Sequence, residues 1–320
     1  MGVSQTRLPI SDQSTPSGEV TIASPWVRRL LIANLVVQVG IIVTGGLVRL
    51  TGSGLGCPTW PQCTPGSYTP TVHQAQGFHK HIEFGNRLLT WVLTAVAIAV
   101  LIALYRWARA RTDLIRGAWI IIAGIVAQAL LGGVTVLTGL NPWTVALHFL
   151  GSAALVAVAA WMLWRSAQEP GPREWALHPL AERLAQGVCV VTAVVLLLGT
   201  IVTGSGPHSG DAETPARTGF DPRAMSWLHA DAVMVLVGLV IAMWLVARMT
   251  SRSATAMRAW ALVVGVVLAQ GLIGYVQYFT KLPEVLVLAH MLGAALLVVA
   301  VTRAMVLSKP PVGSVGEMRT

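Results

Sequence analysis

The run Val145-Ala-Leu-His148-Phe-Leu-Gly151-Ser-Ala-Ala-Leu155 decides the fold, because a near copy, Val287-Leu-Ala-His290-Met-Leu-Gly293-Ala-Ala-Leu296, follows later in the chain. Each copy places one histidine inside a long apolar run. Aligning the two histidines fixes a shift of 142 residues between positions 148 and 290. The same shift superposes further residues: Ala127-Gln128 on Ala269-Gln270, Gly132 on Gly274, and Leu140 on Leu282. The chain is therefore predicted to be an internal duplication.

The composition indicates an integral membrane protein. Of 320 residues, 54% are hydrophobic and only 11% are charged, which is outside the range of soluble domains. The net charge of +9 comes from basic residues at the ends of apolar runs and not from one patch, so nucleic acid is not an expected partner. The lipid bilayer is the expected surroundings of the protein.

Eight apolar runs are long enough to cross a hydrocarbon core of about 30 Å. They lie near residues 28–48, 84–105, 115–138, 143–164, 184–203, 226–247, 257–279 and 285–307. Arginines precede the first run and fill the second, fourth and sixth connections. By the positive-inside rule, these connections and both termini are expected to be cytoplasmic in a multi-pass protein of the cell membrane.

The predicted fold is all-α, with two tandem four-helix bundles. Four spans per repeat is an even number, so both halves have the same orientation and a pseudo-two-fold axis along the membrane normal is expected. The expected divisions of the chain are a disordered cytoplasmic tail at 1–24, a first half at 25–165, a cytoplasmic linker at 166–183, a second half at 184–307, and a cytoplasmic tail at 308–320.

The outer connection after the first span contains Cys57 and Cys63, and the third cysteine, Cys189, lies alone in an apolar run. An oxidising compartment outside the membrane favours a disulfide between the first two. Trp60, between them, is expected in the aromatic belt at the membrane interface.

Three histidines, His148, His229 and His290, fall near the outer starts of spans four, six and eight. Ionisable groups at membrane depth indicate a functional site, because leaving them unpaired is costly. His229 and His290, on different helices and flanked by small residues, are typical of bis-axial haem ligation. Zinc or copper would recruit more cysteine, histidine or carboxylate ligands than these spans offer.

The first half departs from this pattern. A shift of 143 residues, between positions 86 and 229, places Asn86 opposite His229, and asparagine is a poor iron ligand. The neighbouring segment supplies His79 and Glu83, which share one helical face with Asn86 at spacings i, i+4 and i+7.

With these features the chain resembles the haem A synthases, which convert haem O to haem A for terminal oxidases. The resemblance covers all eight spans. It rests on Thr51-Gly-Ser-Gly-Leu-Gly-Cys57-Pro-Thr-Trp-Pro-Gln-Cys63, on Ile82-Glu83-Phe-Gly-Asn86-Arg87, on the three histidines and on the repeat.

The resemblance implies a haem b held by His229 and His290, and a haem O substrate near His148 and Glu83. Many members have a histidine where this chain has Asn86, so the substrate iron is expected to bind His148 alone, or His148 with His79 or His81. Arg49 and Arg87, at the outer ends of spans one and two, are candidates for pairing with haem propionates or for snorkelling to the interface.

The reaction implied is oxidation of a ring methyl to a formyl group by two hydroxylations and loss of water. Glu83 is the candidate catalytic residue, for proton relay or charge stabilisation; the alternative is an acidic residue favoured by the helix dipole. An electron donor, haem O synthase and assembly factors of the terminal oxidase are expected partners.

The competing function is a non-catalytic bis-histidine cytochrome that carries electrons. A third possibility, a duplicated transporter, would require broken helices at the membrane midplane.

Overall fold

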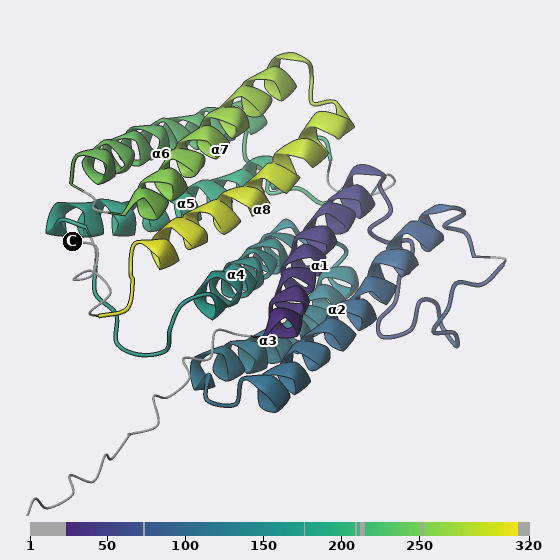
Figure 1. Ribbon diagram of the computed structural model, residues 1–320. Coiled ribbons are helices and arrows are strands. Elements are labelled where there is room, and N and C mark those ends of the chain that lie inside the picture. The colour runs from purple at the N-terminus through teal and green to yellow at the C-terminus, as the bar shows by residue number, and fades with distance from the viewer. Residues whose placement is uncertain are drawn as a thin grey trace, which may run out of the picture.

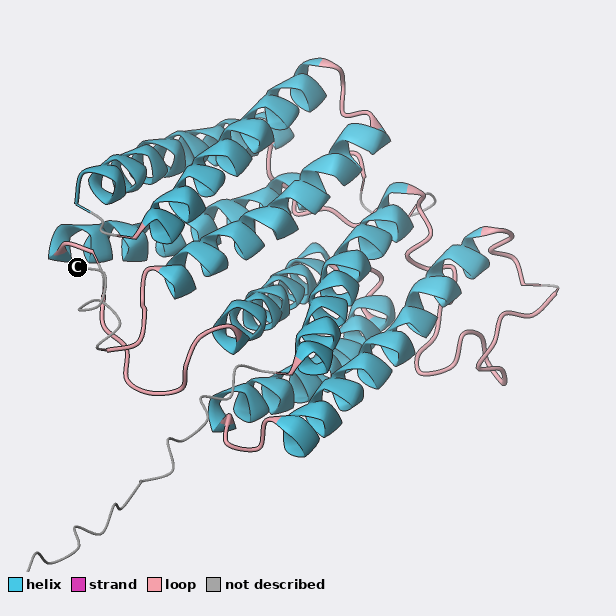
Figure 2. Cartoon of the chain, in the orientation of Figure 1, coloured by secondary structure: helices cyan, strands magenta, loops and turns pink. Residues whose placement is uncertain are grey.

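Eight long helices make up the computed structural model, which describes residues 24–312 except 73, 176, 209, 212–214 and 251–252. All eight predicted spans are confirmed, and the described residues contain isolated bridges but no strand (Figure 2). The terminal segments 1–23 and 313–320, which cover most of the two predicted tails, lie outside the described residues. The helices are α1 (Pro25–Leu50), α2 (His79–Trp107), α3 (Thr112–Leu137), α4 (Pro142–Ser166), α5 (Pro179–Ser205), α6 (Pro222–Thr250), α7 (Ala254–Phe279) and α8 (Glu284–Leu307).

Most helices extend a few residues beyond the predicted spans, because hydropathy marks only the apolar part of each helix. The largest differences are at the starts of α2 and α5, which begin at His79 and Pro179 and not near residues 84 and 184. A proline in the first turn is preorganised for a helix, and the preceding His178 caps it by accepting from the N–H of Leu180 at 3.2 Å. Asn141 caps α4 in the same way, accepting from the N–H of Trp143 at 2.9 Å.

The helices pack as two bundles side by side, α1 to α4 and α5 to α8 (Figure 1). Within each bundle, consecutive helices contact each other and the first contacts the fourth. Between the bundles, α4 packs on α8, α1 on α8, and α4 on α5. Exchanging α1 with α5 and α4 with α8 leaves this set of contacts unchanged, which is the pattern that a two-fold axis between the halves gives.

The bundles meet through small residues and expose large apolar ones. Gly46 of α1 faces α8 so closely that a Cβ added to it would lie 2.8 Å from the sulfur of Met291. On the outer faces, Val36, Trp91 and Leu272 are each more than 60% exposed. Apolar side chains in this position suit contact with lipid, as expected for a multi-pass membrane protein.

One end of the molecule, which we call the disulfide end, carries the connections 51–78, 138–141, 206–221 and 280–283. Here the two halves are joined by Arg49 at the end of α1. Its Nε donates to the carbonyl of His208 at 2.6 Å, and its Nη2 to the carbonyl of Thr203 at 2.9 Å. The structure thus gives Arg49 a third role beside the two expected from sequence: it ties the first half to the α5–α6 connection.

The opposite end, which we call the arginine end, carries the connections 108–111, 167–178 and 251–253. Arg111, only 1% exposed, donates to both carboxylate oxygens of Asp113 at 3.0 and 3.2 Å and to the carbonyl of Arg165 at 2.8 Å. Arg165 also pairs with Asp113 at 3.1 Å. A single carboxylate therefore neutralises two guanidinium groups where α3 begins and α4 ends.

Replacing Asp113 by asparagine leaves both guanidinium groups without a counter-charge while keeping the size of the side chain. Breaking a buried pair from one side costs roughly 3 kcal/mol or more, so we expect a clear fall in the thermal unfolding temperature of the purified protein in detergent. Glu169→Gln, an exposed change at the same end, is the control and is expected to leave that temperature within error. Equal unfolding temperatures for both variants would show that the Asp113 pairs add little.

Candidate functional site

His229 on α6 and His290 on α8 lie next to each other near the disulfide end. The centroids of their rings are 6.4 Å apart, and the ring planes make an angle of 77°. Both side chains are half-buried. The structure therefore brings together the two histidines that the sequence selected as a pair.

The spacing of these rings suits one metal-centred macrocycle between them. A metal–imidazole bond is about 2 Å long and the ring centre lies about 1 Å beyond the nitrogen, so two axial imidazoles have centroids about 6 Å apart. No group of three or more His, Cys, Asp or Glu side chains is placed to hold a metal ion in the described part of the chain. Two imidazoles suffice for haem, which brings four equatorial nitrogens of its own.

Glycines make room for both rings. A Cβ added to Gly199 of α5 would lie 3.3 Å from Cε1 of His229, and one added to Gly274 of α7 would lie 3.5 Å from Cε1 of His290. His148 on α4 has the same surroundings, because Gly132 of α3 faces its Cε1 at 3.3 Å. Gly132 and Gly274 are equivalent in the sequence repeat, so the repeat preserves a packing contact of the histidines.

Asn86 on α2 is engaged with α1 in the first half. Its Oδ1 accepts a hydrogen bond from Oγ1 of Thr44 at 2.8 Å. The corresponding contact in the second half is that of His229 with Gly199. Where the second half has the imidazole of His229, the first half thus has the amide of Asn86, which is already hydrogen-bonded to a neighbouring helix.

The other two histidines proposed as ligands in the first half, His79 and His81, are exposed at the start of α2. Nδ1 of His79 lies 2.8 Å from Oγ of Ser53, and the ring of His81 lies beside Phe78. Both side chains are on the outside of the disulfide end, so only His148, of the three histidines expected as ligands in the first half, packs against a neighbouring helix.

Glu83, one turn after His79, is buried with an exposure of 5%. Its Oε2 accepts from the N–H of Cys57 at 2.5 Å, and its Oε1 accepts from Arg87 at 2.6 and 3.0 Å. Arg87 also donates to the carbonyls of Cys57 at 2.7 Å and Thr59 at 3.0 Å. Glu83 and Arg87 therefore fasten the cysteine loop to α2.

The cysteine loop, residues 57–63, is closed by the predicted disulfide between Cys57 and Cys63, whose side chains are fully buried. Trp60 of this loop packs on α3: a Cβ added to Gly133 would come within 2.5 Å of its indole ring. Gly133 adjoins Gly132, which faces His148. The ring of Trp60 thus reaches onto the helix beside the first-half histidine, in addition to its expected place at the membrane interface, whereas the repeat places Tyr275 at the position of Gly133.

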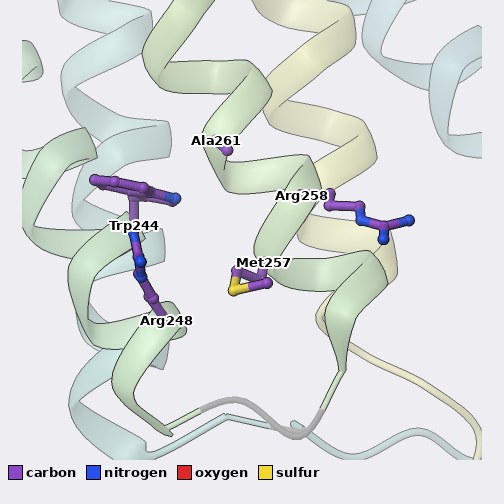
Figure 3. Close-up of a pocket in the computed structure, with 5 residues that line it drawn as sticks. All are labelled: Trp244, Arg248, Met257, Arg258 and Ala261. Atoms are coloured by element: carbon purple, nitrogen blue, oxygen red, sulfur yellow. The ribbon is translucent and has the colours of Figure 1, made fainter.

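A pocket elsewhere does not belong to this site. It has a volume of about 270 Å³ and lies between α6 and α7 near the arginine end (Figure 3). Trp244 on its wall follows His229 by 15 residues, which is about 22 Å along a helix. The residues that line it are Trp244, Arg248, Met257, Arg258 and Ala261.

Residues 28–302 match the family model of the COX15-CtaA proteins, described as cytochrome oxidase assembly proteins. The chain belongs to this family. Proteins named heme A synthase from Symbiobacterium thermophilum, Alkalihalophilus pseudofirmus and Bacillus pumilus are similar to it. Their identities are 28%, 27% and 25%, over 80%, 74% and 82% of this chain and 88%, 84% and 89% of theirs, respectively.

Membership of the COX15-CtaA family confirms the resemblance drawn from the cysteine loop, the Glu83–Arg87 segment and the repeated histidines. The structure adds two functional contacts that sequence reasoning missed. The first is the bonding of Arg87 to loop carbonyls, although the i, i+4 spacing of Glu83 and Arg87 was a visible signal. The second is Trp60 on Gly133, whose signal was the Gly132-Gly133 pair where the repeat has Gly274-Tyr275.

Arg87→Met removes the bonds that fasten the cysteine loop but keeps a long apolar stem. We expect the Cys57–Cys63 disulfide of the folded protein to be reduced several-fold faster by dithiothreitol, because the loop opens more often. Alkylation of the released thiols followed by mass spectrometry measures the rate. Arg106→Met, at the exposed other end of α2, should react at the wild-type rate; an unchanged rate in Arg87→Met would show that the disulfide is protected by other contacts.

Proposed function

We propose that the chain is a haem A synthase that oxidises the ring methyl of haem O to a formyl group. Membership of the family and the names of the relatives support a role in haem A synthesis. The observation that carries the finer assignment is the inequality of the two halves. One half has a facing pair of histidines, and the other has a single half-buried histidine together with a buried carboxylate.

In this proposal the second half, 184–307, holds haem b through His229 and His290. When bound, haem b supplies one-electron transfer. The chain's own contribution is to hold two imidazoles facing each other and to make room for their rings at Gly199 and Gly274. A ligand set that is saturated on both faces suits a resident electron carrier.

The first half, 25–165, takes haem O. His148 would supply one nitrogen for the substrate iron, whereas Asn86, the repeat equivalent of His229, is bonded to Thr44 and is a weak iron ligand. A site with one strong ligand suits a substrate that must enter and leave. Trp60, fixed on Gly133 beside Gly132, shields this site from water at the disulfide end.

Glu83 is the proposed catalytic group. Its carboxylate is held in place by the N–H of Cys57 and by two nitrogens of Arg87, so it presents a fixed acceptor at the rim of the first half. A fixed carboxylate of this kind is suited to relaying protons or to stabilising positive charge during oxidation of the methyl group. Arg87, engaged with Glu83 and the loop carbonyls, positions this carboxylate and is less suited to a haem propionate.

The orientation in the membrane follows from charge. We propose that the arginine end, with both chain termini and the linker 166–183, is cytoplasmic, and that the disulfide end faces the oxidising side of the cell membrane. The proposed partners are an electron donor, haem O synthase and assembly factors of the terminal oxidase. A cytochrome that only carries electrons would be expected to have two similar pairs of histidines, and Asn86 in place of one histidine of the first half favours the enzyme.

Alanine variants separate the two halves. His229→Ala or His290→Ala should remove the low-spin haem b spectrum of the purified protein and most of the activity. His148→Ala should keep much of that spectrum yet abolish haem A formation, measured in pigment extracts by chromatography. If His148→Ala removes the resident haem while His290→Ala keeps it, the cofactor and substrate halves are exchanged.

Glu83→Gln keeps the size of the side chain and its bond to Cys57 but removes the charge and the proton acceptor. Haem O should still bind, and haem A production should fall at least tenfold. Co-purified haem O and haem A are quantified from the same preparation, with exposed Glu169→Gln as the control. Normal haem A output from the Glu83 variant rules out this role for the carboxylate.

A further inference from the structure

The sequence repeat carries a second pair of polar residues into the bundles, Gln128 on α3 and Gln270 on α7. Each lies one turn before the glycine that faces a histidine, at positions 132 and 274. We propose that these glutamines are positioning residues that hold the imidazoles of His148 and His290 through Nδ1 and leave Nε2 for haem iron. The inference rests on the proposed function only in taking these histidines as haem ligands.

In the second half, Gln270 is buried between α7 and α8 with an exposure of 8%. Its Nε2 donates to the backbone carbonyl of His290 at 3.0 Å. Among the described residues, two buried atoms of this contact have no hydrogen-bond partner: Oε1 of Gln270 and Nδ1 of His290. Gln270 and His290 thus already contact each other, and each has one unpaired polar atom: an amide oxygen on the glutamine and a ring nitrogen on the histidine.

In the first half, Gln128 contacts His148 in the same way, and here it reaches the ring. The amide orientation that satisfies both of its polar atoms places Nε2 at 3.0 Å from the carbonyl of His148 and at 2.8 Å from Nδ1. Its Oε1 then accepts from the N–H of Ser152 at 3.2 Å. The glutamine side chain therefore spans the backbone and the ring of the same histidine.

A glycine one turn after each histidine makes this contact possible. A Cβ on Gly151 or on Gly293 would overlap the amide nitrogen of Gln128 or Gln270. The spacing of the four residues is therefore the same in both halves: Gln128, Gly132, His148 and Gly151 correspond to Gln270, Gly274, His290 and Gly293. One glycine accommodates the ring and the other accommodates the amide that holds it.

The chemistry of a ligated imidazole explains why an amide is placed there. An imidazole bound to a metal through Nε2 carries its proton on Nδ1 and needs an acceptor for it. Without iron, Nδ1 of His148 accepts from the amide nitrogen of Gln128. At His290, Oε1 of Gln270 has no partner and is available to accept from the Nδ1–H of an iron-bound ring, while Nε2 keeps its bond to the backbone carbonyl. A neutral amide oxygen orients the ring while drawing less on its proton than a carboxylate does, which keeps the reduction potential of the bound iron higher.

The test compares Gln270→Leu and Gln270→Glu in the full-length protein purified with its haem b. Loss of the acceptor in the leucine variant should raise the midpoint potential, and a charged acceptor in the glutamate variant should lower it. A tenfold change in the reduction equilibrium in each direction corresponds to a shift of about 59 mV for one electron. Gln128→Leu, the equivalent change in the other half, should leave the haem b potential unchanged.

Haem b content and the low-spin spectrum, recorded on the same samples, separate this inference from the proposed function. Opposite shifts with haem b retained support the positioning role. Haem b retained with unshifted potentials, or with shifts of the same sign, overturns that role and leaves the proposed function standing. Because the glutamate variant preserves size and polarity, it gives a result even if the leucine variant does not fold. Wild-type protein that binds no haem b contradicts the proposed function itself.

Discussion

An imidazole inside a membrane bundle needs a defined place for its ring, and the rest of this structure depends on meeting that need. Lipid offers neither water nor counter-charge, so a misplaced imidazole remains unsatisfied. A glycine on the neighbouring helix opens the space beside each of the three histidines. The position of each histidine therefore depends on how its helix packs against a neighbour. The repeat carries one such packing, that of α3 on α4, into the second half as that of α7 on α8.

The same framework has been altered in one half to give a different site. At the position equivalent to His229, the first half has Asn86, which is bonded to Thr44. At the position of Tyr275 it has Gly133, which admits Trp60 from the cysteine loop. The first change removes an imidazole, and the second removes a tyrosine side chain and makes room for the indole ring of Trp60. In the proposed assignment, one helical arrangement thus gives a site with two histidine ligands in one half and a site with one in the other.

The sequence predicted the helices, the repeat, the disulfide and the facing pair of histidines, because each depends on residue type and spacing. It did not predict the contacts of Arg49 and Arg87, because their acceptors are backbone carbonyls, which every residue carries and no sequence pattern marks. It did not predict the contact of Trp60 with α3 either, because the partner residue, Gly133, has no side chain to indicate one. Gln128 and Gln270 were visible in the repeat, but the contact with the histidines depends on how α3 crosses α4 and how α7 crosses α8.

The contacts between the halves bear on how the two proposed sites work together. The helices that carry His148 and His290, α4 and α8, pack directly on each other where the two-fold pattern places its axis (Figure 1). Both histidines occupy equivalent positions near the same end of these helices, so duplication sets the two sites side by side at one depth. Electron transfer through protein needs donor and acceptor to be near each other, whereas the substrate needs a separate entrance. Two bundles that meet through α4 and α8 satisfy both requirements. The helices that carry the two histidines contact each other, and each proposed site faces the other helices of its own bundle.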